Sequence, residues 1–104
     1  MKQFTSKEQT DRLIEAGFPA PRIASPCLGI EEDYILVPRY TLGELIEMLP
    51  KAVDDWELSI RVDYFYKQRW AVEYGCHVDY LAVEIELVDA IYDVLLKLKS
   101  NGKI

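Results

Sequence analysis

The chain has little of what metal sites and covalent catalysis require. It contains a single histidine, His77, and two cysteines, Cys27 and Cys76. Two cysteines so far apart define no disulfide framework, and a zinc site needs about four nitrogen, sulfur or oxygen ligands. No glycine-rich phosphate loop, dinucleotide fingerprint or serine elbow is present. We therefore expect free thiols, no cofactor and no enzymatic activity.

Long apolar runs are also missing. No stretch approaches the roughly 18 apolar residues of a membrane span. The opening residues, Met-Lys-Gln-Phe-Thr-Ser, lack the apolar centre of a signal peptide. We therefore expect a cytoplasmic protein without membrane contact. Glycine and proline number five each, while half of the 104 residues are apolar or aromatic, so we expect one globular domain over residues 1–104.

Basic residues are outnumbered by acidic ones. Twelve lysines and arginines stand against eighteen aspartates and glutamates, giving a net charge of −6. Binding to a phosphate backbone draws mainly on lysine and arginine, so we do not expect a nucleic-acid partner. The simplest interpretation of the acidic charge is that it keeps the protein in solution. A mimic of nucleic acid is the alternative, and it would require carboxylates gathered on one face.

Helix signals are clear at three places. The first helix is expected over residues 6–16, with Thr5 or Ser6 as its cap and Gly17 and Phe18 forming a Schellman close. The second begins at Thr41, with Glu44 three residues on in capping-box spacing, and ends before Pro50. Its apolar residues recur at helical spacing: Leu42, Leu45, Ile46 and Leu49.

The third helix is expected from about Glu84 to Ser100, with Asn101-Gly102 as its stop signal. Its polar residues fall on one narrow stripe, so the remaining apolar arc is wider than a surface helix on a small sheet needs. Either helices and sheet together cover this arc, or part of it meets another chain. On the second alternative, the interacting residues are Leu87, Ile91 and Val94.

Three strands are predicted. A short apolar run at Tyr34–Val37 precedes Pro38, and apolar and polar residues alternate over Leu58–Tyr64. Trp70–Tyr74 is expected to form a hairpin with the second strand. The order α-β-α-β-β-α predicts an α+β fold: a two-layer sandwich with helices on one face of an antiparallel or mixed sheet of about three strands.

The hairpin between the last two strands is rich in aromatic and basic residues. Four of them are candidate interaction residues, because exposed aromatics are enriched at protein interfaces. They are Phe65, Tyr66, Arg69 and Trp70. The alternative is that Tyr64, Trp70 and Tyr74 are cross-strand core pairs and that Phe65 lies under a loop.

Cys76 and His77 are the densest group of metal-ligand residue types, and a small metal-binding or enzymatic domain centred on them is the second hypothesis. Adjacent residues of an extended chain point to opposite sides, which disfavours a cysteine–histidine nucleophile pair. The simpler interpretation is a loop in which Cys76 packs as a small apolar group.

Two segments, Tyr40–Glu47 and Glu86–Tyr92, resemble a group of small proteins of gut anaerobic bacteria that sit in prophages or other mobile elements. That group has no established activity, so no functional residue is carried over. The resemblance implies a bacterial or phage cytoplasmic setting and an accessory, partner-binding role. Together with the apolar arc and the aromatic hairpin, it leads us to expect a non-enzymatic protein-interaction domain that associates with itself as a homodimer.

Overall fold

The computed structural model describes residues 2–22, 38–63, 69–75 and 78–104. Its helices are α1 (Lys7–Glu15), α2 (Leu42–Met48) and α3 (Leu87–Ser100), with a short 3₁₀ turn, η3, at Val78–Tyr80. Its strands are β1 (Ala52–Val53), β2 (Trp56–Asp63), β3 (Arg69–Tyr74) and β4 (Leu81–Glu84). The strands form one antiparallel sheet in the order β1-β2-β3-β4. The predicted α+β fold is confirmed, with four strands rather than about three. The strand expected at Tyr34–Val37 lies outside the described residues.

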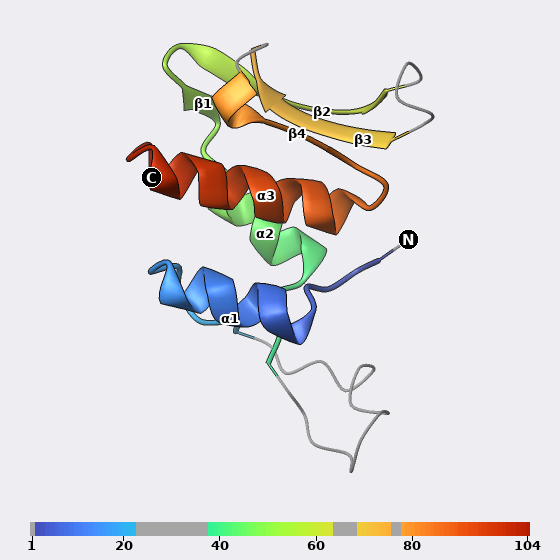
Figure 1. The fold of residues 1–104 in the computed structure, drawn as a ribbon, viewed down its shortest axis with the longest axis vertical. Helices are drawn as coiled ribbons and strands as arrows, with labels where there is room; N and C mark the ends of the chain where they lie inside the picture. The colour runs from blue at the N-terminus through green and yellow to red at the C-terminus, as the bar shows by residue number, and fades with distance from the viewer. Residues whose placement is uncertain (1, 23–37, 64–68, 76–77) are drawn as a thin grey trace.

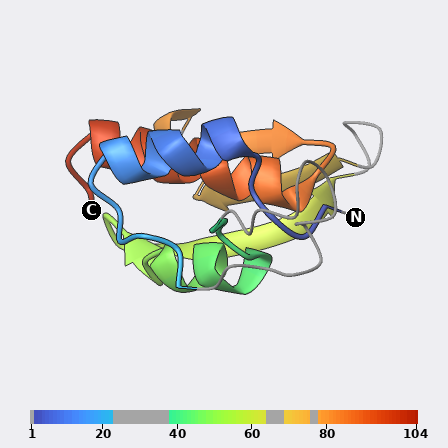
Figure 2. The same cartoon turned by 90° about the horizontal axis from the view of Figure 1, so that it is seen from below.

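The described helices all lie on one side of the sheet. Figure 1 shows the sheet at one end of the molecule, α3 packed directly beneath it, and α1 beyond α3. In the view from below, α1 lies over α3 while α2 occupies the neighbouring position (Figure 2). Helix α3 is therefore enclosed by the sheet on one side and by α1 and α2 on the other.

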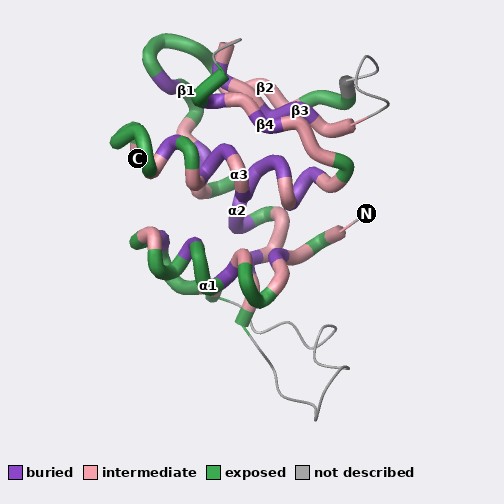
Figure 3. Tube along the Cα trace, viewed as in Figure 1, coloured by how far each residue is buried: buried purple, intermediate pink, exposed green. Residues whose placement is uncertain are grey.

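This position explains the wide apolar arc of α3. Figure 3 shows buried positions along most of the helix. Leu87 is 6% exposed, and Ile91 and Val94 are 0% exposed within the single chain. The prediction that these three residues meet another chain is therefore wrong, because the sheet and the other two helices already cover them. The remaining buried side chains of α3 are Val88, Ala90, Tyr92, Leu95 and Leu98.

The chain between β3 and α3 differs from expectation. The third helix begins at Leu87, not near Glu84, because Leu81–Glu84 pair with β3 as an edge strand. This strand has only four residues and runs almost directly into the helix, so its alternation is too short to stand out from the sequence. Strand β1, which pairs only Ala52 and Val53 with β2, was likewise not predicted.

The ends of α1 and the start of α2 follow the sequence closely. Ser6 and Gln9 form the capping box of α1, and Thr41 and Glu44 form that of α2. Gly17 has a φ of 99°, and the backbone NH of Phe18 donates to the Leu13 carbonyl at 3.1 Å, as a Schellman close requires. No helix in the described part of the chain is long and apolar enough to span a bilayer.

Candidate functional site

The predicted hairpin residues fall into two groups. Phe65 and Tyr66 lie outside the described residues, so their role stays a prediction. Trp70 is half-buried and packs against the hydrophobic core beside Val72 and Tyr74, both 0% exposed. Trp70 and Tyr74 therefore contribute to the core, as the alternative interpretation of the hairpin expects, while Arg69 lies on the opposite face of β3.

Cys76 and His77, the centre of the metal hypothesis, also lie outside the described residues, as does Cys27. Among the residues that are described, no three histidine, cysteine, aspartate or glutamate side chains are grouped closely enough to hold a metal ion. The metal hypothesis at this pair therefore stays a prediction.

The sheet has a face that no described helix covers. Val72, Tyr74 and Ala82 belong to the core, so even-numbered positions of β3 and β4 point toward the helices. Odd-numbered positions point away, and the β2–β3 register places odd positions of β2 beside them. We call this side the outer face. Its described side chains are those of Glu57, Ser59, Arg61, Arg69, Ala71, Glu73, Leu81 and Val83.

Apolar side chains form one end of the outer face. Val83 lies opposite Ala71 in the register, and Leu81 lies opposite Glu73. Ala71 is fully buried by its neighbours, whereas Leu81 and Val83 are half-buried. These two side chains were not among the predicted site residues, because β4 itself was not predicted. The one feature of the sequence that could have indicated this strand is the alternation of the larger Leu81 and Val83 with the small Ala82.

Opposite charges frame this apolar patch. Arg61 Nη2 lies 3.2 Å from Glu73 Oε1, with 46% of the Arg61 side chain and 12% of the Glu73 side chain exposed. Arg69 and Glu57 extend the same alternation of sign along the strands. The described side chains of the outer face include two acidic and two basic residues, while the whole chain carries a net charge of −6. The face is therefore far closer to neutral than the molecule as a whole.

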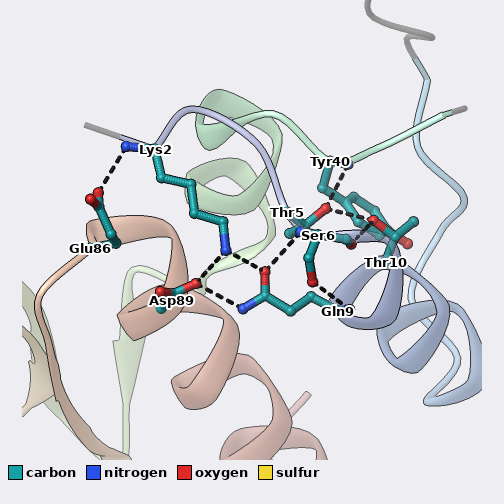
Figure 4. Close-up of polar contacts among 8 residues, drawn as sticks. All are labelled: Lys2, Thr5, Ser6, Gln9, Thr10, Tyr40, Glu86 and Asp89. Atoms are coloured by element: carbon teal, nitrogen blue, oxygen red, sulfur yellow. Dashed lines mark hydrogen bonds and ion pairs between the residues drawn. The ribbon is translucent and has the colours of Figure 1, made fainter. Parts of the chain in front are cut away.

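A second cluster fastens the N-terminal segment to α3 (Figure 4). Lys2 Nζ donates to Asp89 Oδ1 at 2.8 Å and to Gln9 Oε1 at 3.1 Å, and its backbone nitrogen donates to Glu86 at 2.8 Å. Gln9 Nε2 donates to the same Asp89 oxygen at 2.8 Å. Burial raises the pKa of Asp89, but the hydrogen bonds from Lys2 and Gln9 and the Lys2 charge outweigh it and hold that pKa below its usual value.

The same segment is tied to the start of α2. Phe4 forms a single antiparallel bridge with Thr41, and the backbone groups of Thr5 and Tyr40 are joined at 3.0 Å. The buried hydroxyl of Thr5 is 2.7 Å from that of Thr10 and accepts from the Tyr40 backbone nitrogen at 3.1 Å. The polar groups of this cluster form hydrogen bonds with one another, so the cluster joins elements of the fold rather than forming an open site. We call the contacts of Lys2 and Gln9 with Asp89 the polar clasp.

One small cavity lies beside α2, with a volume of about 270 Å³. The polar residues that line it bind one another. Arg22 Nη2 lies 2.6 Å from Glu47 Oε2, and the Arg22 backbone nitrogen donates to Glu44 at 3.0 Å. The Tyr40 hydroxyl donates to the Pro19 carbonyl, and burial, with Glu44 nearby, raises the pKa of that phenol. The lining residues are Pro19, Ala20, Arg22, Tyr40, Glu44, Glu47 and Met48.

The described carboxylates come from all three helices, from the turn before β2 and from strands of the sheet. The mimic of nucleic acid stays a prediction. Comparison with known proteins gives no match to the chain, whether the comparison is with family models, curated proteins or solved structures.

Proposed function

We propose that this chain is a non-catalytic interaction domain that associates with a second copy of itself through the outer face of its sheet. The observation that carries the proposal is the apolar pair Leu81 and Val83 on a face that no described helix covers. We place this association in a bacterial or phage cytoplasmic setting, as the sequence resemblance implies.

Charge limits which surface two copies can bring together. Two molecules of net charge −6 repel each other over most approaches. The outer face carries Arg61 and Arg69 beside Glu57 and Glu73, so this repulsion is smaller there than the net charge of the whole chain implies. In a two-fold arrangement each copy presents the same patch, so an arginine of one copy can lie opposite a glutamate of the other.

The geometry of a sheet suits such a contact. Two sheets pack face to face at about 10 Å, with side chains from their inner faces interdigitating. Leu81 and Val83 would then lose their remaining exposure, and each Å² of apolar surface removed from water contributes roughly 25 cal/mol. The interface would leave the core around α3 intact.

Sedimentation equilibrium of the wild type and two variants tests the proposal. Val83→Lys places a charge on the outer face, and Ile14→Lys is the matched control on α1, where Ile14 is 44% exposed. We expect the wild type and Ile14→Lys to dimerise and Val83→Lys to remain a folded monomer. A monomeric wild type at all concentrations, or equal dimerisation of both variants, would contradict the proposal.

A further inference from the structure

Strand β4 forms an edge of the sheet. It pairs with β3 through Leu81–Glu84, and no strand in the described part of the chain lies on its other side. An edge strand presents alternate backbone N–H and C=O groups with which a further strand can pair. The Leu81 carbonyl accepts from Lys97 Nζ of α3 at 2.6 Å. A backbone acceptor of β4 is therefore within reach of a donor that does not belong to the sheet.

The side chains along this edge alternate in character. Leu81 and Val83 point to the outer face and are half-buried, whereas Ala82 is buried toward the helices. Glu84 shares the strand parity of Ala82, so it lies on the helix side. Ile85 directly follows the strand and is 66% exposed. A strand added beside β4 would place every second side chain next to the apolar pair and the others next to Glu84.

The chain around this edge is strongly acidic. Between Arg69 and Lys97 it contains no lysine or arginine, but it contains six carboxylates. They are Glu73, Asp79, Glu84, Glu86, Asp89 and Asp93. Ion pairs with Arg61 and Lys2 take up two of these charges. The excess of negative charge favours a partner with positive side chains at this edge and disfavours a second copy of this acidic chain there.

From these observations we propose that the edge of β4 binds an extended segment of another protein in which apolar residues alternate with lysine or arginine. The apolar side chains of the segment pack beside Leu81 and Val83, and its basic side chains lie beside Glu84. A backbone N–H of the segment replaces Lys97 at the Leu81 carbonyl. The inference does not rest on the proposed self-association, because the added strand pairs in the plane of the sheet rather than across its outer face.

Peptide titration followed by amide NMR shifts tests the inference. The probe is acetyl-Val-Lys-Val-Lys-Val-Lys-Val-amide. One control peptide has glutamate in place of each lysine. A second control is N-methylated at every residue, so it keeps the charge but has no backbone N–H to donate. We expect only the unmethylated lysine peptide to bind, with the largest amide shifts at Leu81–Glu84.

Substitutions at the edge locate the site. Glu84→Gln should weaken binding of the lysine peptide about two- to fivefold, the range for one exposed ion pair. Glu8→Gln, the same change at an exposed position of α1, should leave binding unchanged. Lys97→Met should strengthen binding, because it removes an internal donor and a like charge.

Four results would overturn the inference. They are equal binding of either control peptide, no shifts at millimolar lysine peptide, shifts centred away from β4, and equal effects of the two glutamine variants.

Discussion

Lys2 Nζ and Asp89 Oδ1 lie 2.8 Å apart, which joins the N-terminal segment to the first turn of the most buried helix. Both side chains are 32% exposed, so the pair is partly shielded from water. Because Gln9 donates to the same oxygen, Asp89 connects the N-terminal segment, α1 and α3 at one point. Helix α1, which is separated from the sheet by α3, is thus held partly by this polar clasp.

Removing the lysine tests the contribution of the clasp. We expect Lys2→Met to lower the free energy of unfolding by about 1 kcal/mol, since a charged hydrogen-bonding group is lost from a partly buried pair. The lowered pKa of Asp89 means that its contribution is present above its ordinary value and is lost as the pH falls through the folded value. The variant should therefore lose stability mainly at pH values above the ordinary aspartate pKa of 3.8. Lys7→Met, at an exposed position of α1, is the control, and an equal loss there would refute the clasp.

Substitution of Ile91 tests which face of α3 lies in the core. Because its side chain is 0% exposed in the single chain, Ile91→Ala should cost about 3 kcal/mol of unfolding free energy through lost packing and a cavity. Leu96, which is half-buried at the edge of the core, gives the matched comparison and should lose clearly less when changed to alanine. A loss at Ile91 no greater than at Leu96, measured by urea unfolding, would place Ile91 outside the core.

The turn between β1 and β2 offers a stabilising substitution. Asp54 and Asp55 have φ angles of 50° and 70°, the left-handed values of a type I′ turn, in which glycine is favoured at the second position. We expect Asp55→Gly to raise the free energy of unfolding by about 0.5 to 1 kcal/mol. Asp54→Gly should give no such gain, because Asp54 accepts hydrogen bonds from Tyr80 and Lys103 at 3.1 Å. If thermal unfolding ranks the two variants in the reverse order, the left-handed backbone at Asp55 does not destabilise the turn.

Trp56 lies where a side chain at Gly75 would go. A Cβ at Gly75 would meet the indole Cδ2 at 2.6 Å, whereas one at Gly102 would meet nothing within 4 Å. Both glycines have positive φ, so Gly75→Ala and Gly102→Ala share a backbone cost of about 1 to 2 kcal/mol. Gly75→Ala should cost about 1 kcal/mol more because the indole must move.

A double-mutant cycle isolates this contact. In a Trp56→Ala background, the extra cost of Gly75→Ala should disappear and the two glycine substitutions should become equivalent. If the extra cost persists without the indole, its cause lies elsewhere than in the Trp56 contact.

Sequence patterns that span only a few residues predicted most of the helices and strands. The capping boxes at Ser6 and Thr41 and the glycine at position 17 mark helix ends through bonds made within a few residues, so they can be read from the sequence. Strand β2 was recognisable because its alternation is long enough to stand out, and β3 was recognisable as the hairpin partner that follows it. Strand β4 was missed, since its four residues gain their identity from pairing with β3.

The candidate site was less predictable, because it depends on which element covers which. Leu87, Ile91 and Val94 are apolar in any arrangement. Only the placement of α1 and α2 beneath α3 decides that they are core rather than interface. The outer face depends in the same way on a register among three strands, which local spacing does not encode.

The central claim is that two copies meet through Leu81 and Val83. An NMR sample that mixes ¹³C-labelled and unlabelled protein tests it most directly, because filtered NOEs then report only contacts between copies. At concentrations where the protein is a dimer, we predict intermolecular NOEs to the methyl groups of Leu81 and Val83. A protein that stays monomeric, or intermolecular NOEs confined to methyl groups elsewhere, would contradict the account.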